Sequence, residues 1–463
     1  MKQFFSNLKG DAFGGITAGV VALPLALAFG VSSGLGPSAG LYGAIFISFF
    51  AALFGGTNTQ ISGPTAPMTA VSMVLVSGIV AANNGDIDVA LPAILTVFLI
   101  AGLFQIGLGL VGLGKYIKYI PYPVVSGFMT AIGVIILLTQ ILPSLGYNPK
   151  EDLDYVNTFK AQAKELVLRN ILNNEAGDGV LVLKDFKSTI EKAPLISPEK
   201  IFNESKTLAS KEASGTVGAL KLLPRAIKNI NWLELLLTVG TILIIYGFKR
   251  ITSIIPSTLV ALIVMTGCAI IFNLDYIPIE EIPSGLPIPQ LAVFAQFKLA
   301  AITPYIFTGF TLALLGAIDS LLTSVVADNM TKTKHNPNKE LIGQGIGNSI
   351  ASIFGGIPGA GATIRTVVNI NSGGKTKLSG MIAGVMLLFV LLVLGPIASK
   401  IPSAVLSGIL ITVGIGVMDY KGLKAIPALP KDLTFGPLKL SSEVLIMLIV
   451  LFLSTFWDLI FAV

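Results

Sequence analysis

The sequence has little charge and almost no cysteine or histidine, and each shortage excludes a class of protein. Cys268 and His335 are the only residues of their kinds, so the chain can form neither an internal disulfide nor a cluster of cysteine and histidine metal ligands. Charged residues make up 12% of the chain, against 53% hydrophobic residues, and the mean hydropathy is +0.82. Such a chain needs a bilayer as its solvent, and its apolar runs of about 20 residues predict an all-α polytopic membrane protein.

The apolar runs form two sets of about seven. The first set lies near residues 13–33, 38–55, 65–81, 90–112, 121–144, 233–248 and 255–273. The second set lies near residues 303–326, 341–355, 363–371, 378–396, 402–418, 441–452 and 453–463. Because an odd number of spans in each half inverts the second half, we expect about 14 spans as 7+7 inverted repeats. Residues 1–147 and 231–300 would form repeat one, and residues 301–463 would form repeat two.

The charges of the loops predict the orientation. With a cytoplasmic N-terminus, basic residues such as Lys9, Lys115 and Lys118 lie in inner loops, and acidic residues such as Asp86 and Glu280 lie in outer loops. This is the positive-inside pattern. We therefore expect a multi-pass protein of the cell (inner) membrane with both termini in the cytoplasm.

Residues 148–230 interrupt the apolar pattern with a charge-rich insertion. They hold 13 Lys and Arg and 11 Asp and Glu, interleaved, and the predicted orientation places them outside the cytoplasm. Helical spacing in residues 159–172 and 183–190 predicts a small cap of helices rather than a disordered loop. The net charge of +2 is too small to predict an anion funnel, so an accessory insertion is the simpler interpretation.

Two apolar segments are broken by Gly, Pro and Thr at matching places in the two halves. The first break covers residues 61–69 (ISGPTAPMT), and the second covers residues 355–363 (GGIPGAGAT). Irregular backbone at membrane depth is tolerated only where it lines a cavity. Matched breaks in two halves therefore predict a transport site between inverted repeats.

Threonines within both breaks are candidate ligands for an anion. Two half-helices that start near the bilayer midplane present unpaired backbone N–H groups and two positive dipole ends. Thr65, Thr69 and Thr363 would add hydroxyl donors to that site. The alternative is that these threonines cap the half-helices and touch no ligand.

Asp319 is a carboxylate in the middle of an apolar helix, which marks a functional site by default. Thr323 lies four residues later on the same helical face. Together with the free carbonyls of a broken segment they make an all-oxygen set that suits Na⁺. A proton carried by Asp319 and a purely structural hydrogen bond are the alternatives.

Arg365 is the only arginine inside a predicted span and lies at the start of the second half-helix. It could be the counter-charge of a bound anion. It could equally neutralise a neighbour such as Asp319 or a group of carbonyls. The sequence does not separate these two roles.

Several segments resemble the SulP family of anion transporters. They are residues 14–30, 54–56, 62–69 and 316–323, and the likeness extends over the whole chain except the insertion. Within the family, Asp319, Thr323 and residues 326–331 most resemble the sodium-dependent bicarbonate transporters of cyanobacteria.

The resemblance implies a core (gate) domain that slides against a scaffold domain, usually in a homodimer. On matching positions, Thr69, Ala362 and Thr363 would contact bicarbonate. Asp319, Thr323, Gly361 and Thr363 would hold Na⁺ as the coupling ion. Family members usually continue into a cytosolic STAS domain, and we expect none within this chain.

These observations predict a secondary active anion transporter that couples bicarbonate uptake to Na⁺. Sulfate or dicarboxylate transport coupled to H⁺ and an uncoupled anion channel are the open alternatives. No pair of nucleophile and base is apparent in the sequence, so we do not expect an enzyme.

Overall fold

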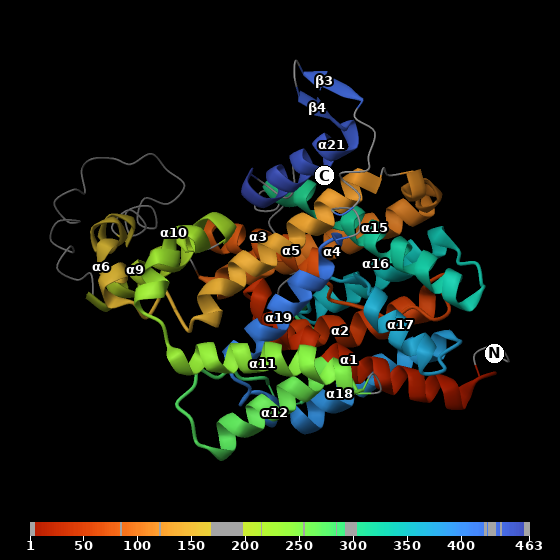
Figure 1. Cartoon of the computed structure of the whole chain (residues 1–463), viewed down its shortest axis with the longest axis horizontal. Coiled ribbons are helices and arrows are strands. Elements are labelled where there is room, and N and C mark those ends of the chain that lie inside the picture. The colour runs from red at the N-terminus through yellow and green to blue at the C-terminus, as the bar shows by residue number, and fades with distance from the viewer. Residues whose placement is uncertain are drawn as a thin grey trace.

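Figure 1 shows a computed structural model of the chain, which is mostly helical. The structure describes residues 5–83, 86–119, 122–167, 198–213, 215–252, 255–283, 285–291, 303–420, 424, 432–435 and 438–457.

The first half has one helix in each of the seven ranges expected from the apolar runs. These helices are α1 (Leu8–Ser33), α2 (Gly36–Phe54), α3 (Ala66–Ala82), α4 (Ile87–Leu110), α5 (Tyr122–Ser144), α11 (Trp232–Ile251) and α12 (Ser257–Ile271). A 3₁₀ turn, η1 (Leu113–Tyr119), joins α4 to α5. α3 begins at Ala66, inside the first break, as expected of a half-helix that starts there.

The second half has the same kinds of element. Its helices are α15 (Ile306–Thr331), α16 (Pro337–Ile353), α17 (Thr363–Asn371), α18 (Lys377–Ala398), α19 (Ser403–Val417) and α21 (Ser442–Phe452). A 3₁₀ turn, η4 (Thr303–Tyr305), precedes α15, and a short antiparallel pair, β3 (Leu433–Phe435) with β4 (Leu438–Leu440), precedes α21. The seventh predicted range, 453–463, holds a π-helical turn, η6 (Leu453–Trp457), and its last six residues lie outside the described part.

Six of the described helices are long and apolar enough to cross a membrane, and five further apolar helices are shorter. The chain is thus a multi-pass membrane protein, while the count of 14 spans and the inverted repeat stay predictions. The helices pack in two groups. In the first group, α1 contacts α2 and α18, and α16 contacts α2 and α4. In the second group, α5 contacts α19 and α21, and α11 contacts α12 and α19.

Two helices begin earlier than the apolar runs suggested. α1 begins at Leu8 rather than near residue 13, and α16 begins at Pro337 rather than near residue 341. The extra turns hold Asp11 and Glu340, which are 0% and 1% exposed. Their carboxylates accept several N–H groups, which offsets the cost of burying the charge.

The described part of the insertion is helical and lies beside the end of α5, at the left of Figure 1. It contains α6 (Leu153–Thr158), α9 (Pro198–Glu212) and α10 (Gly215–Lys228). The helix expected over residues 183–190 and the end of the one expected over residues 159–172 lie outside the described residues.

α10 packs on the end of α5 through apolar contacts and forms an ion pair with Asp152, the N-cap of α6. Leu142 and Tyr147 pack against Leu222 and its neighbours on α10. Asp152 forms an ion pair with Arg225 and accepts the Tyr147 hydroxyl at 2.8 Å. Two cavities, of about 410 and 490 Å³, lie where the insertion faces the ends of α1, α3 and α5, and no predicted site residue lines them.

Candidate functional site

The two breaks meet as a two-stranded antiparallel pair. β1 (Ser62–Gly63) pairs with β2 (Ala360–Gly361), with Ser62 opposite Gly361 and Gly63 opposite Ala360. Gly63 has φ of +149°, which an L side chain rarely adopts, so glycine is required there. The pair places the starts of α3 and α17 next to each other. Side chains accept other backbone groups of the breaks, since the Ile61 N–H donates to the Thr366 hydroxyl and the Gly359 N–H donates to Asn348.

Both half-helices begin without a side-chain cap. Thr65 is the N-cap of α3 and Ala362 is the N-cap of α17, and neither makes a capping hydrogen bond with its side chain. The first N–H groups of each helix therefore have no capping partner, and each helix end carries a partial positive charge. This arrangement suits an anion.

Two predicted anion ligands have hydroxyls that make no hydrogen bond of normal geometry. Thr65 and Thr69 are 7% and 3% exposed, and the Oγ1 atom of each is buried, with that of Thr65 interacting with the Asp319 carboxylate. The alternative that these hydroxyls cap α3 does not hold, because a capping hydroxyl would accept a backbone N–H of the first turn. Buried hydroxyls normally find a partner, so unpaired ones are candidates for a ligand.

Three of the four predicted Na⁺ ligands lie in direct contact. The Thr323 hydroxyl donates to the Gly361 carbonyl at 2.9 Å and lies 2.8 Å from the Thr363 hydroxyl. Asp319, the fourth, is one turn before Thr323 on α15, and its Oδ2 is buried without a partner. A carboxylate, two hydroxyls and a carbonyl are hard oxygen ligands, so the residues present fit a small hard cation.

Arg365 is buried next to the first break with most of its donors unpaired. It is 2% exposed, and its Nη2 donates to the Pro64 carbonyl at 2.5 Å, while Nε and Nη1 have no partner. Arg365 and Asp319 interact electrostatically. The geometry is compatible with both roles predicted for this arginine.

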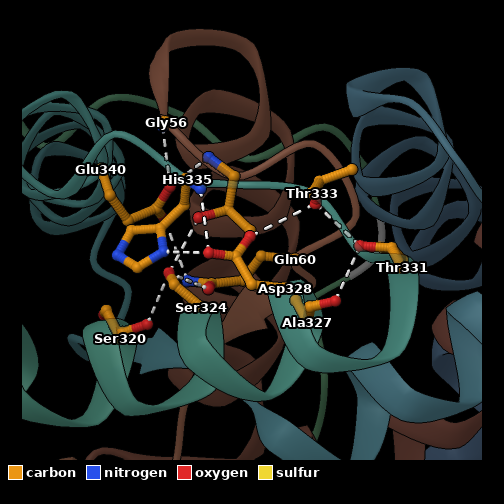
Figure 2. A network of polar contacts seen from close by, with 11 residues as sticks. Gly56, Gln60, Ser320, Ser324, Ala327, Asp328, Thr331, Thr333, His335 and Glu340 are labelled. Carbon is orange, nitrogen blue, oxygen red and sulfur yellow. Dashed lines mark hydrogen bonds and ion pairs between the residues drawn. The ribbon is translucent and has the colours of Figure 1, made fainter.

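Glu340 and Gln60 were not among the residues predicted from the sequence to serve the site. Glu340 lies in the polar first turn of α16, where a carboxylate usually faces solvent, and Gln60 lies just before the first break. Figure 2 shows Gln60 between Glu340 and Ser324 on α15: the Gln60 amide donates to Glu340 and accepts the Ser324 hydroxyl. The one available signal was position in the sequence: Gln60 directly precedes the first break, and Glu340 directly precedes the apolar run over residues 341–355.

The same view shows His335 next to Asp328 at the end of α15, with His335 Nδ1 2.7 Å from Asp328 Oδ2. Among the described residues, no group of three or more His, Cys, Asp and Glu side chains could hold a metal ion.

The sequence of this chain is similar to those of known transporters. Residues 8–171 and 199–432 match the sequence profile of the Sulfate permease family. The chain is 43% identical to the bicarbonate transporter BicA of Synechocystis sp. over 91% of its own length, and it spans 64% of that relative. It is 27% identical to Sulfate transporter 4.1, chloroplastic, of Arabidopsis thaliana, over 89% of its length and 52% of the relative.

Two solved structures share the arrangement of helices. The transmembrane domain of a cyanobacterial bicarbonate transporter, BicA, superposes with a TM-score of 0.76 at 41% identity, over 99% of this chain and 98% of that one. The structure of SLC26A9 superposes with a TM-score of 0.70 at 18% identity, over 100% of this chain and 64% of that one.

Proposed function

The chain belongs to the sulfate permease family, and from that membership we propose that it is a secondary active transporter that carries bicarbonate together with Na⁺. The observation that carries this proposal is the pairing of β1 with β2, which places two uncapped half-helix starts next to each other. Thr65, Thr69, Ala362, Thr363 and Arg365 would bind the anion. Asp319, Thr323, Gly361 and Thr363 would bind Na⁺.

The charges of the site give a reason for coupling. The buried Arg365 supplies a positive charge within reach of Asp319, so this carboxylate has a counter-charge in the empty carrier. The empty site and the site with both ligands are then neutral, while a site with one ligand carries a net charge. Moving a net charge through apolar surroundings is unfavourable, so transport of one ligand alone is suppressed.

The same balance of charges in the site favours a monovalent anion. Sulfate with one Na⁺ would leave one uncompensated negative charge, whereas bicarbonate with one Na⁺ leaves none. By linkage, Na⁺ and bicarbonate should raise each other's affinity by the same factor. Two relatives that are named bicarbonate transporters support this choice of anion.

The transport movement that we propose is a sliding core. Helices α1–α4 and α15–α18 pack with one another and would form the core that carries the site, while α5, α11, α12, α19 and α21 would form the scaffold. The 7+7 inverted repeat gives such a carrier two related conformations around one site. Two copies would associate through their scaffolds, with the termini in the cytoplasm.

Uptake by the purified protein in liposomes tests this proposal. Labelled bicarbonate, sulfate and a dicarboxylate are compared with an inward gradient of Na⁺, of H⁺ or of neither. We expect accumulation of bicarbonate above its equilibrium level only with the Na⁺ gradient. Accumulation of sulfate or dicarboxylate with the H⁺ gradient would replace the proposed substrate, and equilibration without accumulation would indicate a channel.

A further inference from the structure

Glu340 on α16 is a buried carboxylate bonded to the segment that leads into the first break. Its Oε2 accepts the N–H groups of Gly56 at 2.7 Å and Thr57 at 2.8 Å. Its Oε1 accepts the side-chain amides of Gln60 and Gln344, each at 2.9 Å. These four hydrogen bonds fix the segment relative to α16, and Figure 2 shows Glu340 with Gly56 and Gln60.

Gln60 connects Glu340 to the second break. Its amide nitrogen donates to Glu340, and its amide oxygen accepts the Ser324 hydroxyl at 2.8 Å, so both ends of the amide are fixed. A side chain at Gly361 would place its Cβ 2.2 Å from the Gln60 amide nitrogen. The Gln60 amide therefore packs directly on the backbone of Gly361, which must be glycine.

Gly361 in turn sets the position of the candidate cation ligands. Its N–H donates to the Ser320 hydroxyl at 3.1 Å, and its carbonyl accepts the Thr323 hydroxyl at 2.9 Å. Thr323 contacts Thr363. A shift of Gln60 would therefore move a carbonyl and two hydroxyls of the site, although Glu340 touches none of them.

We propose that Glu340 is a positioning residue for the cation site, acting through Gln60 on the Gly361 carbonyl. Glu340 does not contact Na⁺ in this arrangement. The inference rests on the proposed function, because its readout is the affinity for Na⁺.

Asp11 provides a matched control within the same chain. It is also a buried carboxylate, and it accepts the N–H groups of Lys375 at 2.7 Å and Thr376 at 2.9 Å. Those residues follow α17 and lie at the opposite end of that helix from Gly361. Asp11 thus has the same kind of bonds as Glu340 without the connection to the cation ligands.

The experiment compares Glu340→Gln with Asp11→Asn in the full chain. The Na⁺ concentration that gives half of the maximal thermal stabilisation is measured on purified protein, with choline replacing Na⁺ as reference. The Na⁺ concentration that gives half-maximal bicarbonate uptake is measured in liposomes. Loss of a hydrogen bond to a charged group should raise both concentrations at least about tenfold in Glu340→Gln. Asp11→Asn should lower the unfolding temperature and leave both concentrations unchanged.

A second variant tests the same connection in case Glu340→Gln does not fold. Gln60→Met keeps the size of the side chain and leaves Glu340 its three other donors, and it should also raise the half-saturating Na⁺ concentration. Unchanged Na⁺ affinity in Gln60→Met, or equal behaviour of Glu340→Gln and Asp11→Asn, would overturn the inference. Wild-type protein that responds to Na⁺ in neither assay would instead contradict the proposed function.

Discussion

The two sides of the β1–β2 pair differ in how their polar atoms are bonded. On the side of α16, Glu340 accepts four N–H groups and Gln60 is bonded at both ends of its amide. On the side of α3, the hydroxyls of Thr65 and Thr69 make no hydrogen bond of normal geometry, and two donor atoms of Arg365 are unpaired. On the α16 side, the unpaired oxygen of Gln344 is an exception to the contrast. Both sides are buried, so the difference does not come from access to solvent.

This contrast separates groups that hold the backbone from groups that are available to a ligand. A buried polar group that is fully bonded gains nothing from a ligand, and removing it lowers stability. A buried polar group without a partner is unfavourable until a ligand satisfies it. Variants on the unpaired side should therefore change ligand affinity more than stability, and the following predictions test that division.

The largest effect is expected for Asp319→Asn. The substitution keeps the size of the side chain but removes the charge that would attract Na⁺ and balance Arg365, so Na⁺-driven accumulation of bicarbonate should be abolished. Uptake in liposomes measures the activity, and the amount of folded protein after purification is the control. Accumulation with an unaltered Na⁺ dependence would show that the cation binds elsewhere.

The next effect is expected for Arg365→Gln, which can still donate to the Pro64 carbonyl but carries no charge. If Arg365 is the counter-charge of the anion, bicarbonate affinity should fall roughly 10- to 150-fold, as for a lost charge-assisted hydrogen bond. If it mainly neutralises Asp319, Na⁺ affinity should rise instead. Titration of each ligand at a saturating level of the other distinguishes the two, and Arg365→Lys is the control that keeps the charge. No change in either affinity would exclude both roles.

Smaller effects are expected for Thr69→Ala and Thr363→Ala. Each removes one hydroxyl and leaves the backbone donors and the helix dipole in place, so the expected loss is about 1–2 kcal/mol, or roughly 5- to 30-fold in anion affinity. Thr→Val at the same positions should lose about as much, because the shape is kept and the hydroxyl is not. Affinity measured at saturating Na⁺ tests this, and two alanine variants that bind as well as wild type would place the anion outside this site.

The smallest effect on transport is expected for the ion pair between Arg225 and Asp152, which lies outside the membrane helices. Arg225 holds the pKa of the Asp152 carboxyl well below its usual range. The pair therefore contributes stability above the usual aspartate pKa of about 3.9 and loses it as the pH falls below that value. Asp152→Asn should make the insertion more sensitive to protease at pH 7 and change bicarbonate uptake by less than about twofold. Wild-type protein should show the same sensitivity only in strong acid.

A large loss of transport in Asp152→Asn would mean that the ion pair between α10 and the start of α6 controls access to the site. That outcome would also end the interpretation of the insertion as accessory. The two cavities between the insertion and the ends of α1 and α3 would then be the place to look for the cause.

The membrane helices could be predicted from the sequence because hydrophobicity alone specifies them. The seven ranges of the first half each contain a helix, and Gly, Pro and Thr marked both breaks. Asp319 stood out because a carboxylate is rare in an apolar run. These are signals that a single segment carries by itself.

The bonds between distant segments could not be predicted in the same way. The pairing of Ser62 with Gly361 depends on the packing of both halves, and nothing local to either residue indicates it. Glu340 lies at the polar start of its helix, so hydropathy assigns it to a loop, whereas the structure buries it against Gly56 and Gln60. A buried carboxylate whose partners come from another part of the chain leaves no periodic trace in the sequence.

The same pairing constrains how the protein is made. Arg365 and Pro64, which bond across the two breaks, are 301 residues apart. At about 5–20 residues per second, a ribosome needs roughly 15–60 s to reach the second break after it has made the first. For that time the newly made first break lacks the strand that will satisfy its backbone. Variants that weaken the β1–β2 pair should therefore lower the yield of folded protein during biosynthesis, even where the finished molecule transports normally.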